Sequence, residues 1–107
     1  MNITILGKQY EVKFIDSDSM VGQAGGANSM SQVICINKEQ GHQQQADTLV
    51  HEVIHVISYD LGLDLDEATV RRLACGLISC SALKVDISLD RTTYPVFWSP
   101  NQSVGVQ

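Results

Sequence analysis

The chain has 107 residues, of which 44% are apolar and 18% are charged, and its formal net charge is −5. This length holds one domain with a single modest core, and the composition is that of an ordinary globular protein. The few lysines and arginines are scattered, which argues against direct nucleic-acid binding, and no apolar run reaches the roughly 20 residues of a membrane span.

Two strands and a loop are predicted in the first third of the chain. Residues 2–7 and 9–15 alternate apolar and polar side chains, and the glycine between them predicts a hairpin with a tight turn. Residues 16–31 are rich in Ser, Asp, Gly and Asn, which favours a loop with a short strand near Met20–Gln23. A glycine-rich loop of this kind could also act as a flap.

One more strand and two helices follow. The β-branched run SQVICIN, residues 31–37, predicts a third strand. Residues 43–61 repeat apolar side chains at three- and four-residue steps, which predicts a mostly buried helix that ends at Gly62. A second helix is predicted over residues 66–84. Its buried stripe is expected to consist of Val70, Leu73, Ala74, Leu77 and Ile78.

The last part of the chain gives weaker signals. The segments VDISL and YPVFW within residues 85–107 favour edge strands or an arm, because Pro95 and Pro100 disfavour a long central strand. We expect residues 90–107 to be loosely held. Residues 1–107 as a whole are expected to form a single domain, and a homodimer is one assembly that would cover its remaining apolar surface.

Features of the whole sequence favour the cytoplasm. The start of the chain, MNITILGKQYEV, lacks the basic residues and long apolar stretch of a secretory signal. Cys35, Cys75 and Cys80 are an odd number without a CxxC pair, which is typical of reduced, partly buried thiols in a reducing compartment. A zinc knuckle built from cysteines is therefore excluded.

Residues 51–55 read HEVIH, within the first predicted helix. Positions i and i+4 lie on one helix face, so His51 and His55 can direct two imidazoles to one point, as a tetrahedral zinc site requires. Glu52 beside them can reach a water molecule on the metal rather than the metal itself. Burying two imidazoles on an apolar helix without a partner would also be unfavourable.

A catalytic zinc needs a third protein ligand, and Asp60, Asp64, Asp66 and Glu67 follow the histidines. Asp60 lies five positions after His55, which turns it off the histidine face. Glu67 shares the apolar stripe of the second helix and should face the first. A capping box with Asp64 as N-cap would engage Glu67 at N3, whereas a cap at Asp66 leaves Glu67 free. We favour Glu67 as the ligand.

The stretch TLVHEVIHVISYDLGLDLDEATVRRLACGL, residues 48–77, resembles small zinc metallopeptidases of the gluzincin kind, specifically the ImmA/IrrE-like phage and prophage proteins. The resemblance covers about residues 31–80. It implies a minimal zincin-like α+β fold, with a small antiparallel or mixed three-stranded sheet packed on two helices. It further implies that His51, His55 and Glu67 bind Zn²⁺, that Glu52 is the catalytic acid and base, and that the substrate is a regulatory protein or peptide, such as a repressor.

Several functional questions stay open at this point. The turn before Glu67 is shorter than in larger gluzincins, and no helix-turn-helix is evident. The side chains that could donate a hydrogen bond to the oxyanion are Tyr59, His42, Arg71 and Arg72. The strand 31–37 could bind a substrate along its edge. A zinc-stabilised interaction module without catalysis is the second hypothesis, and a metal-free helical regulator is the third.

Overall fold

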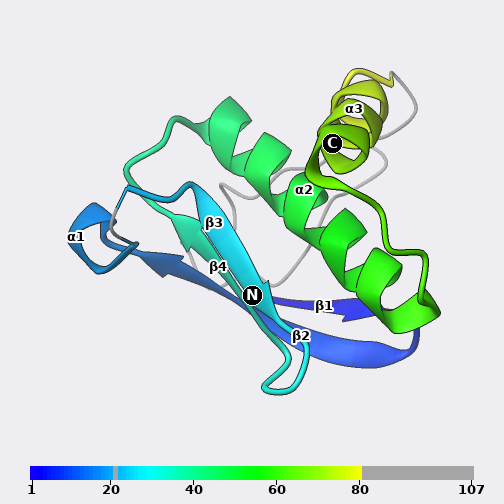
Figure 1. Ribbon diagram of the computed structural model, residues 1–107. Coiled ribbons are helices and arrows are strands. Elements are labelled where there is room, and N and C mark those ends of the chain that lie inside the picture. The colour runs from blue at the N-terminus through cyan, green and yellow to red at the C-terminus, as the bar shows by residue number, and fades with distance from the viewer. Residues whose placement is uncertain (21, 81–107) are drawn as a thin grey trace, which may run out of the picture.

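A computed structural model describes residues 1–20 and 22–80 as a mixed sheet with helices on one side (Figure 1). The α+β class predicted from the sequence is confirmed. The predictions for residues 81–107 lie outside the described residues. The elements in chain order are β1 (Asn2–Ile5), β2 (Lys8–Ile15), α1 (Ser17–Met20), β3 (Gly25–Asn28), β4 (Val33–Asn37), α2 (His42–Leu61) and α3 (Glu67–Ile78).

The described part of the sheet has four strands in the order β1-β2-β4-β3, one more than expected. β1 and β2 form the predicted antiparallel hairpin, whose two-residue turn places Leu6 and Gly7 at φ 51° and 80°. β2 pairs with β4 in parallel, and β3 pairs with β4 antiparallel. The segment predicted as a loop thus contains the helix α1 and the edge strand β3, which lies after the short strand expected near Met20–Gln23.

Helix α2 lies between the sheet and α3, and buries a different side against each (Figure 1). Towards the sheet, Leu49 and Val56 pack on the inward side chains of three strands, which are Ile3, Ile5, Tyr10, Val12, Ile34 and Ile36. Towards α3, Val50 and Ile54 pack on Val70 and Ala74. A third side of α2 is left for the histidines. None of the described helices has the length and apolar character needed to cross a bilayer.

The buried stripe of α3 is narrower than the sequence suggested. Val70 and Ala74 are buried, and Ile78 packs at the edge of their cluster. Leu73 and Leu77, predicted in the same stripe, are exposed, as is Leu61 at the end of α2. A helix that packs on one neighbouring helix buries only the residues that face it, so the outer part of a wide apolar arc remains in contact with solvent.

A buried glutamine holds the start of α2. Its N-cap residue, Gly41, offers no side chain to the first turn. Gln45 is fully buried, and its Nε2 donates to the backbone oxygens of Lys38, at 3.1 Å, and Gln40, at 2.9 Å. The side chain therefore joins the helix to the polar link that precedes it.

Replacing Gln45 by Leu is expected to lower the free energy of unfolding by about 1–3 kcal/mol, because two part-buried hydrogen bonds to backbone carbonyls are lost. Gln43→Leu is the matched control in the same run of glutamines, since Gln43 is exposed. It should change stability by no more than about 0.5 kcal/mol. Urea denaturation of both variants measures the difference, and equal losses would contradict this role for Gln45.

Candidate metal centre

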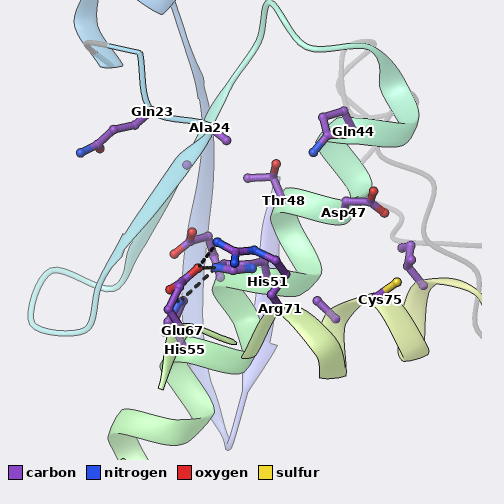
Figure 2. Close-up of a pocket in the computed structure, with 14 residues that line it drawn as sticks. Gln23, Ala24, Gln44, Asp47, Thr48, His51, His55, Glu67, Arg71 and Cys75 are labelled. Atoms are coloured by element: carbon purple, nitrogen blue, oxygen red, sulfur yellow. Dashed lines mark hydrogen bonds and ion pairs between the residues drawn. The ribbon is translucent and has the colours of Figure 1, made fainter. Parts of the chain in front are cut away.

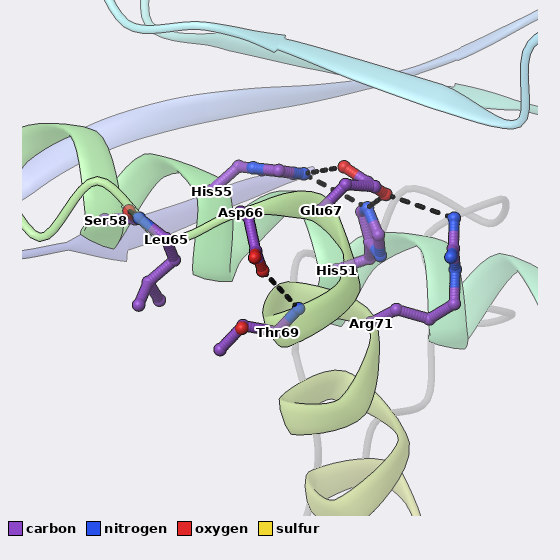
Figure 3. A network of polar contacts seen from close by, with 8 residues as sticks. All are labelled: His51, His55, Ser58, Leu65, Asp66, Glu67, Thr69 and Arg71. Carbon is purple, nitrogen blue, oxygen red and sulfur yellow. Dashed lines mark hydrogen bonds and ion pairs between the residues drawn. The ribbon is translucent and has the colours of Figure 1, made fainter.

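Three side chains from two helices meet at one point beside the sheet (Figure 2). The Nε2 atoms of His51 and His55 on α2 are 3.1 Å apart. Glu67, the first residue of α3, places Oε2 2.7 Å from Nε2 of His51 and Oε1 2.9 Å from Nε2 of His55 (Figure 3). The structure thus brings together the three residues predicted to bind a metal.

The chemistry of this donor set fits a zinc ion. Two imidazole nitrogens and a carboxylate all present lone pairs to the same small volume, and neutral imidazoles would repel each other there unless a proton or a metal cation lay between them. In a tetrahedral site with zinc–nitrogen bonds of about 2.0–2.1 Å, donor atoms lie about 3.3–3.4 Å apart. The observed separations of 2.7–3.1 Å are shorter than this by about 0.2–0.7 Å, a gap that small side-chain rotations would close.

The turn between the helices determines where Glu67 lies. Gly62 adopts a left-handed conformation, with φ 66°, and its N–H and that of Leu63 donate to the last carbonyls of α2. The buried Ser58 then accepts a hydrogen bond at Oγ from the N–H of Leu65, 2.9 Å away. These bonds direct the chain back across α2, so that α3 begins over the histidines.

The N-cap of α3 is Asp66, which resolves the two capping alternatives. Its Oδ1 accepts a hydrogen bond from the N–H of Thr69 at 2.7 Å, and hydrogen bonding to Thr69 holds the pKa of Asp66 below its ordinary value (Figure 3). Asp64 instead lies in the turn with φ 55°. Glu67 is therefore at the first helical position, outside a capping box, and its carboxylate faces the histidines.

The other acidic candidates do not join the cluster. Among the described residues, the group that could hold a metal contains His51, His55 and Glu67 alone. Asp60 approaches Lys8, with 3.9 Å between Oδ2 and Nζ, on the β1–β2 side of α2. Arg71 lies one turn after Glu67, with its Nη2 3.5 Å from Oε2, and adds positive charge beside the carboxylate.

Glu52 is buried beside the cluster, with 9% of its surface exposed. Burial raises the pKa of its carboxyl, and the charge of Glu67 adds to the rise, whereas His55 and His51 oppose it. A carboxylate with a raised pKa is a better proton acceptor near neutral pH than an ordinary surface glutamate. Glu52 is thus suited to proton transfer next to the three donors.

Within residues 1–20 and 22–80, two clefts adjoin the cluster, and Glu52 and His55 line both of them. The first, of about 610 Å³, lies between α2, α3 and the residues at the start of β3 (Figure 2). The second, of about 440 Å³, lies between the β3–β4 turn and the later part of α2. Of the four oxyanion donors considered from the sequence, Arg71 lines the first cleft and Tyr59 the second. His42 and Arg72 are absent from both linings.

Among the described strands, β3 lies at the edge beside the clefts, and the prediction that residues 31–37 provide this edge is wrong. β4 lies between β2 and β3, so its backbone is paired on both sides. β3 is short and has the sequence GGAN, without the alternation that signals a strand. The pair Gly25-Gly26 was the available signal, because glycine within a strand often marks a close approach of another segment.

Gly25 lets β3 approach α2 closely. A Cβ at this position would lie 2.5 Å from Cγ2 of Thr48 and 3.0 Å from the carbonyl oxygen of Cys35. Gln40 connects the residue before β3 to α2. Its Nε2 donates a hydrogen bond to the backbone oxygen of Ala24, and its Oε1 accepts one from Oγ1 of Thr48. The wall of the first cleft therefore depends on a residue without a side chain.

Gly25→Ala is expected to lower the free energy of unfolding by about 1–3 kcal/mol, because the added methyl group overpacks the junction of β3 and α2. Gly26→Ala is the control next to it, since a Cβ there meets nothing within 4 Å. Thermal unfolding of both variants tests this, and a stable Gly25→Ala protein with unchanged hydrogen exchange in β3 would refute it.

The comparisons with known proteins leave the site to be interpreted from its own geometry. Searches of protein-family models, curated proteins and solved structures find no match to this chain.

The three cysteines are free, and Cys75 and Cys80 are exposed, whereas a partly buried position was expected for the thiols. Cys75 lines the first cleft.

Proposed function

We propose that the protein is a zinc-dependent metallopeptidase that hydrolyses a peptide bond in a specific regulatory protein or peptide. The observation that carries this proposal is the convergence of His51, His55 and Glu67 beside the buried carboxyl of Glu52. Two histidines and a glutamate are the ligand set of many catalytic zinc sites, which keep the fourth position for water or substrate. The resemblance of residues 48–77 to gluzincins of the ImmA/IrrE-like kind agrees with this reading.

Each group of the site has a defined part in such a reaction. A zinc ion held by the two histidines and Glu67 would supply a Lewis acid that polarises a carbonyl and lowers the pKa of water. Glu52 accepts the proton of the attacking water and delivers it to the leaving amine. Arg71 and Tyr59, one in each cleft, are the side chains available to donate to the developing oxyanion.

The edge strand β3 is suited to hold an extended substrate. Alternate residues of an edge strand direct their N–H and C=O groups away from the sheet, where a peptide can pair with them. β3 lies beside α2 and contributes residues to both clefts. A peptide added to this edge would therefore pass Glu52 and the metal ligands. We place this activity in the cytoplasm, since all three cysteines are free.

The alternative function is a zinc-stabilised interaction module, in which the metal joins α2 to α3 and no bond is cleaved. Zinc content and cleavage of a mixed peptide library, measured for the wild type and Glu52→Gln, separate the two functions. The peptidase requires cleavage by the wild type that is lost in the variant while zinc is retained. Zinc binding by both proteins without cleavage by either would support the module.

A further inference from the structure

We propose that the second cleft is a subsite for one large apolar side chain of the bound peptide, and that Met30 and Tyr59 are its specificity-determining walls. The proposal rests on the proposed function, because it assigns the cleft to a peptide that lies across Glu52 and His55. It adds the chemical class of substrate that the site selects.

The first observation is the exposure of both walls. Met30 is 95% exposed and Tyr59 is 73% exposed, although both are large and mainly apolar. They belong to different elements, the β3–β4 turn and α2, yet both line the cleft that contains Glu52 and His55. Two large exposed side chains that flank one cleft provide apolar area for a ligand to cover.

The second observation is that Met30 occupies a defined position. Asn28 accepts hydrogen bonds at Oδ1 from the N–H of Met30, at 2.9 Å, and from that of Ser31, at 3.1 Å. This side chain to backbone bonding shapes the turn locally. The turn ends with Gln32 at φ 57°, and β4 follows at once. The short hairpin thus presents Met30 at its tip beside the cleft.

The third observation is the contrast in charge between the clefts. The first cleft is lined by Asp47, Glu67 and Arg71 in addition to Glu52. The second has no charged lining residue besides Glu52 and the ionisable His55, and its other residues are small, polar or apolar. An acidic substrate side chain would lose hydration there beside Glu52 without gaining an ion pair, whereas an apolar one would gain from burial against Met30 and Tyr59.

The distance between the two clefts sets the length of the peptide that would cover both of them. The first cleft involves Ala24 and Thr48, and the second involves Ala27 and Val56, so β3 and α2 pass from one to the other in the same direction. β3 spans about 13 Å at about 3.3 Å per residue. A peptide of about five residues would therefore cover both clefts, with one side chain directed into the second.

The test is binding of capped hexapeptides to the zinc-loaded Glu52→Gln protein, with one position of each peptide varied among Leu, Phe, Ser, Asp and Lys. We expect Leu or Phe at the selected position to bind about tenfold more tightly than Ser or Asp. Met30→Ser with Tyr59→Ser should reduce that preference to within about twofold. Leu63→Ser removes an exposed apolar side chain from the α2–α3 turn, outside both linings, and should preserve the preference.

The outcomes separate this inference from the proposed function. Equal affinity for all peptides, binding by none, or an apolar preference that survives the double substitution would overturn the subsite. Cleavage by the wild type with any of these results would leave the peptidase intact. Conversely, a preference that depends on Met30 and Tyr59 without any cleavage would keep the subsite and remove the peptidase. Melting temperatures of the variants check folding, which should be unaffected at such exposed positions.

Discussion

Glu67→Gln is expected to reduce the affinity for zinc by about 100-fold or more. Glu67 supplies the only carboxylate of the candidate ligand group in the described chain. Mutation of outer partners of metal ligands alone typically costs about 10–100-fold in affinity, so loss of a charged ligand should have at least that effect. Glutamine retains the shape of the side chain, and the cap at Asp66 remains to start the helix.

A chelating dye that competes for zinc measures this affinity at neutral pH. The control is Asp64→Asn, which removes the same charge from the neighbouring turn. Asp64 is exposed at φ 55°, a conformation that asparagine tolerates well. Wild-type affinity in Glu67→Gln, or an equal loss in the control, would show that Glu67 is not a ligand.

Thermal unfolding gives a second measurement of the same site. Zinc at 100 times its dissociation constant should stabilise the wild type by about 2.7 kcal/mol, because it binds only the folded chain. The same concentration should stabilise Glu67→Gln by much less. Without metal the two proteins should melt alike, since Glu67 is half-exposed and its contacts with the histidines are screened by water.

The local features of the site were predictable because they depend on short spacings. The i, i+4 histidines, the apolar repeat of α2 and the glycine that ends it are all encoded within a few turns of one helix. The choice between Asp64 and Asp66 as N-cap was not predictable, because both are good caps at neighbouring positions. The left-handed conformation of Asp64, which continues the turn begun at Gly62, decides it.

The edge strand was not predictable for a different reason. β3 has no alternating side chains, and its pairing with β4 arises from backbone hydrogen bonds between segments that the sequence pattern does not relate. What the sequence did contain was a glycine at the point where Thr48 approaches. The strand that forms the wall of the candidate site therefore has the weakest sequence pattern in the fold. The metal ligands next to it have the strongest.

The position of Glu52 connects the metal ligands on α2 with the clefts beside them. It follows His51 on α2, so the helix that directs the imidazoles also turns this carboxyl into the space between both clefts. Its burial is unfavourable for a charged group and raises its pKa. A residue that served only to stabilise the fold would not need to be ionisable here. This contrast predicts opposite effects of substitution on stability and on reaction rate.

Glu52→Gln is expected to lower kcat for peptide hydrolysis by about 100- to 10,000-fold, the usual contribution of a positioned proton acceptor. Zinc affinity should stay within a few-fold of wild type, because Glu52 is not part of the ligand cluster. The melting temperature of the metal-free variant should equal or exceed that of the wild type, since a neutral amide replaces a buried carboxyl. Glu39→Gln makes the same chemical change at an exposed site outside both clefts, and should retain full activity. A rate for Glu52→Gln near that of Glu39→Gln would exclude Glu52 as the proton acceptor, whatever its effect on stability.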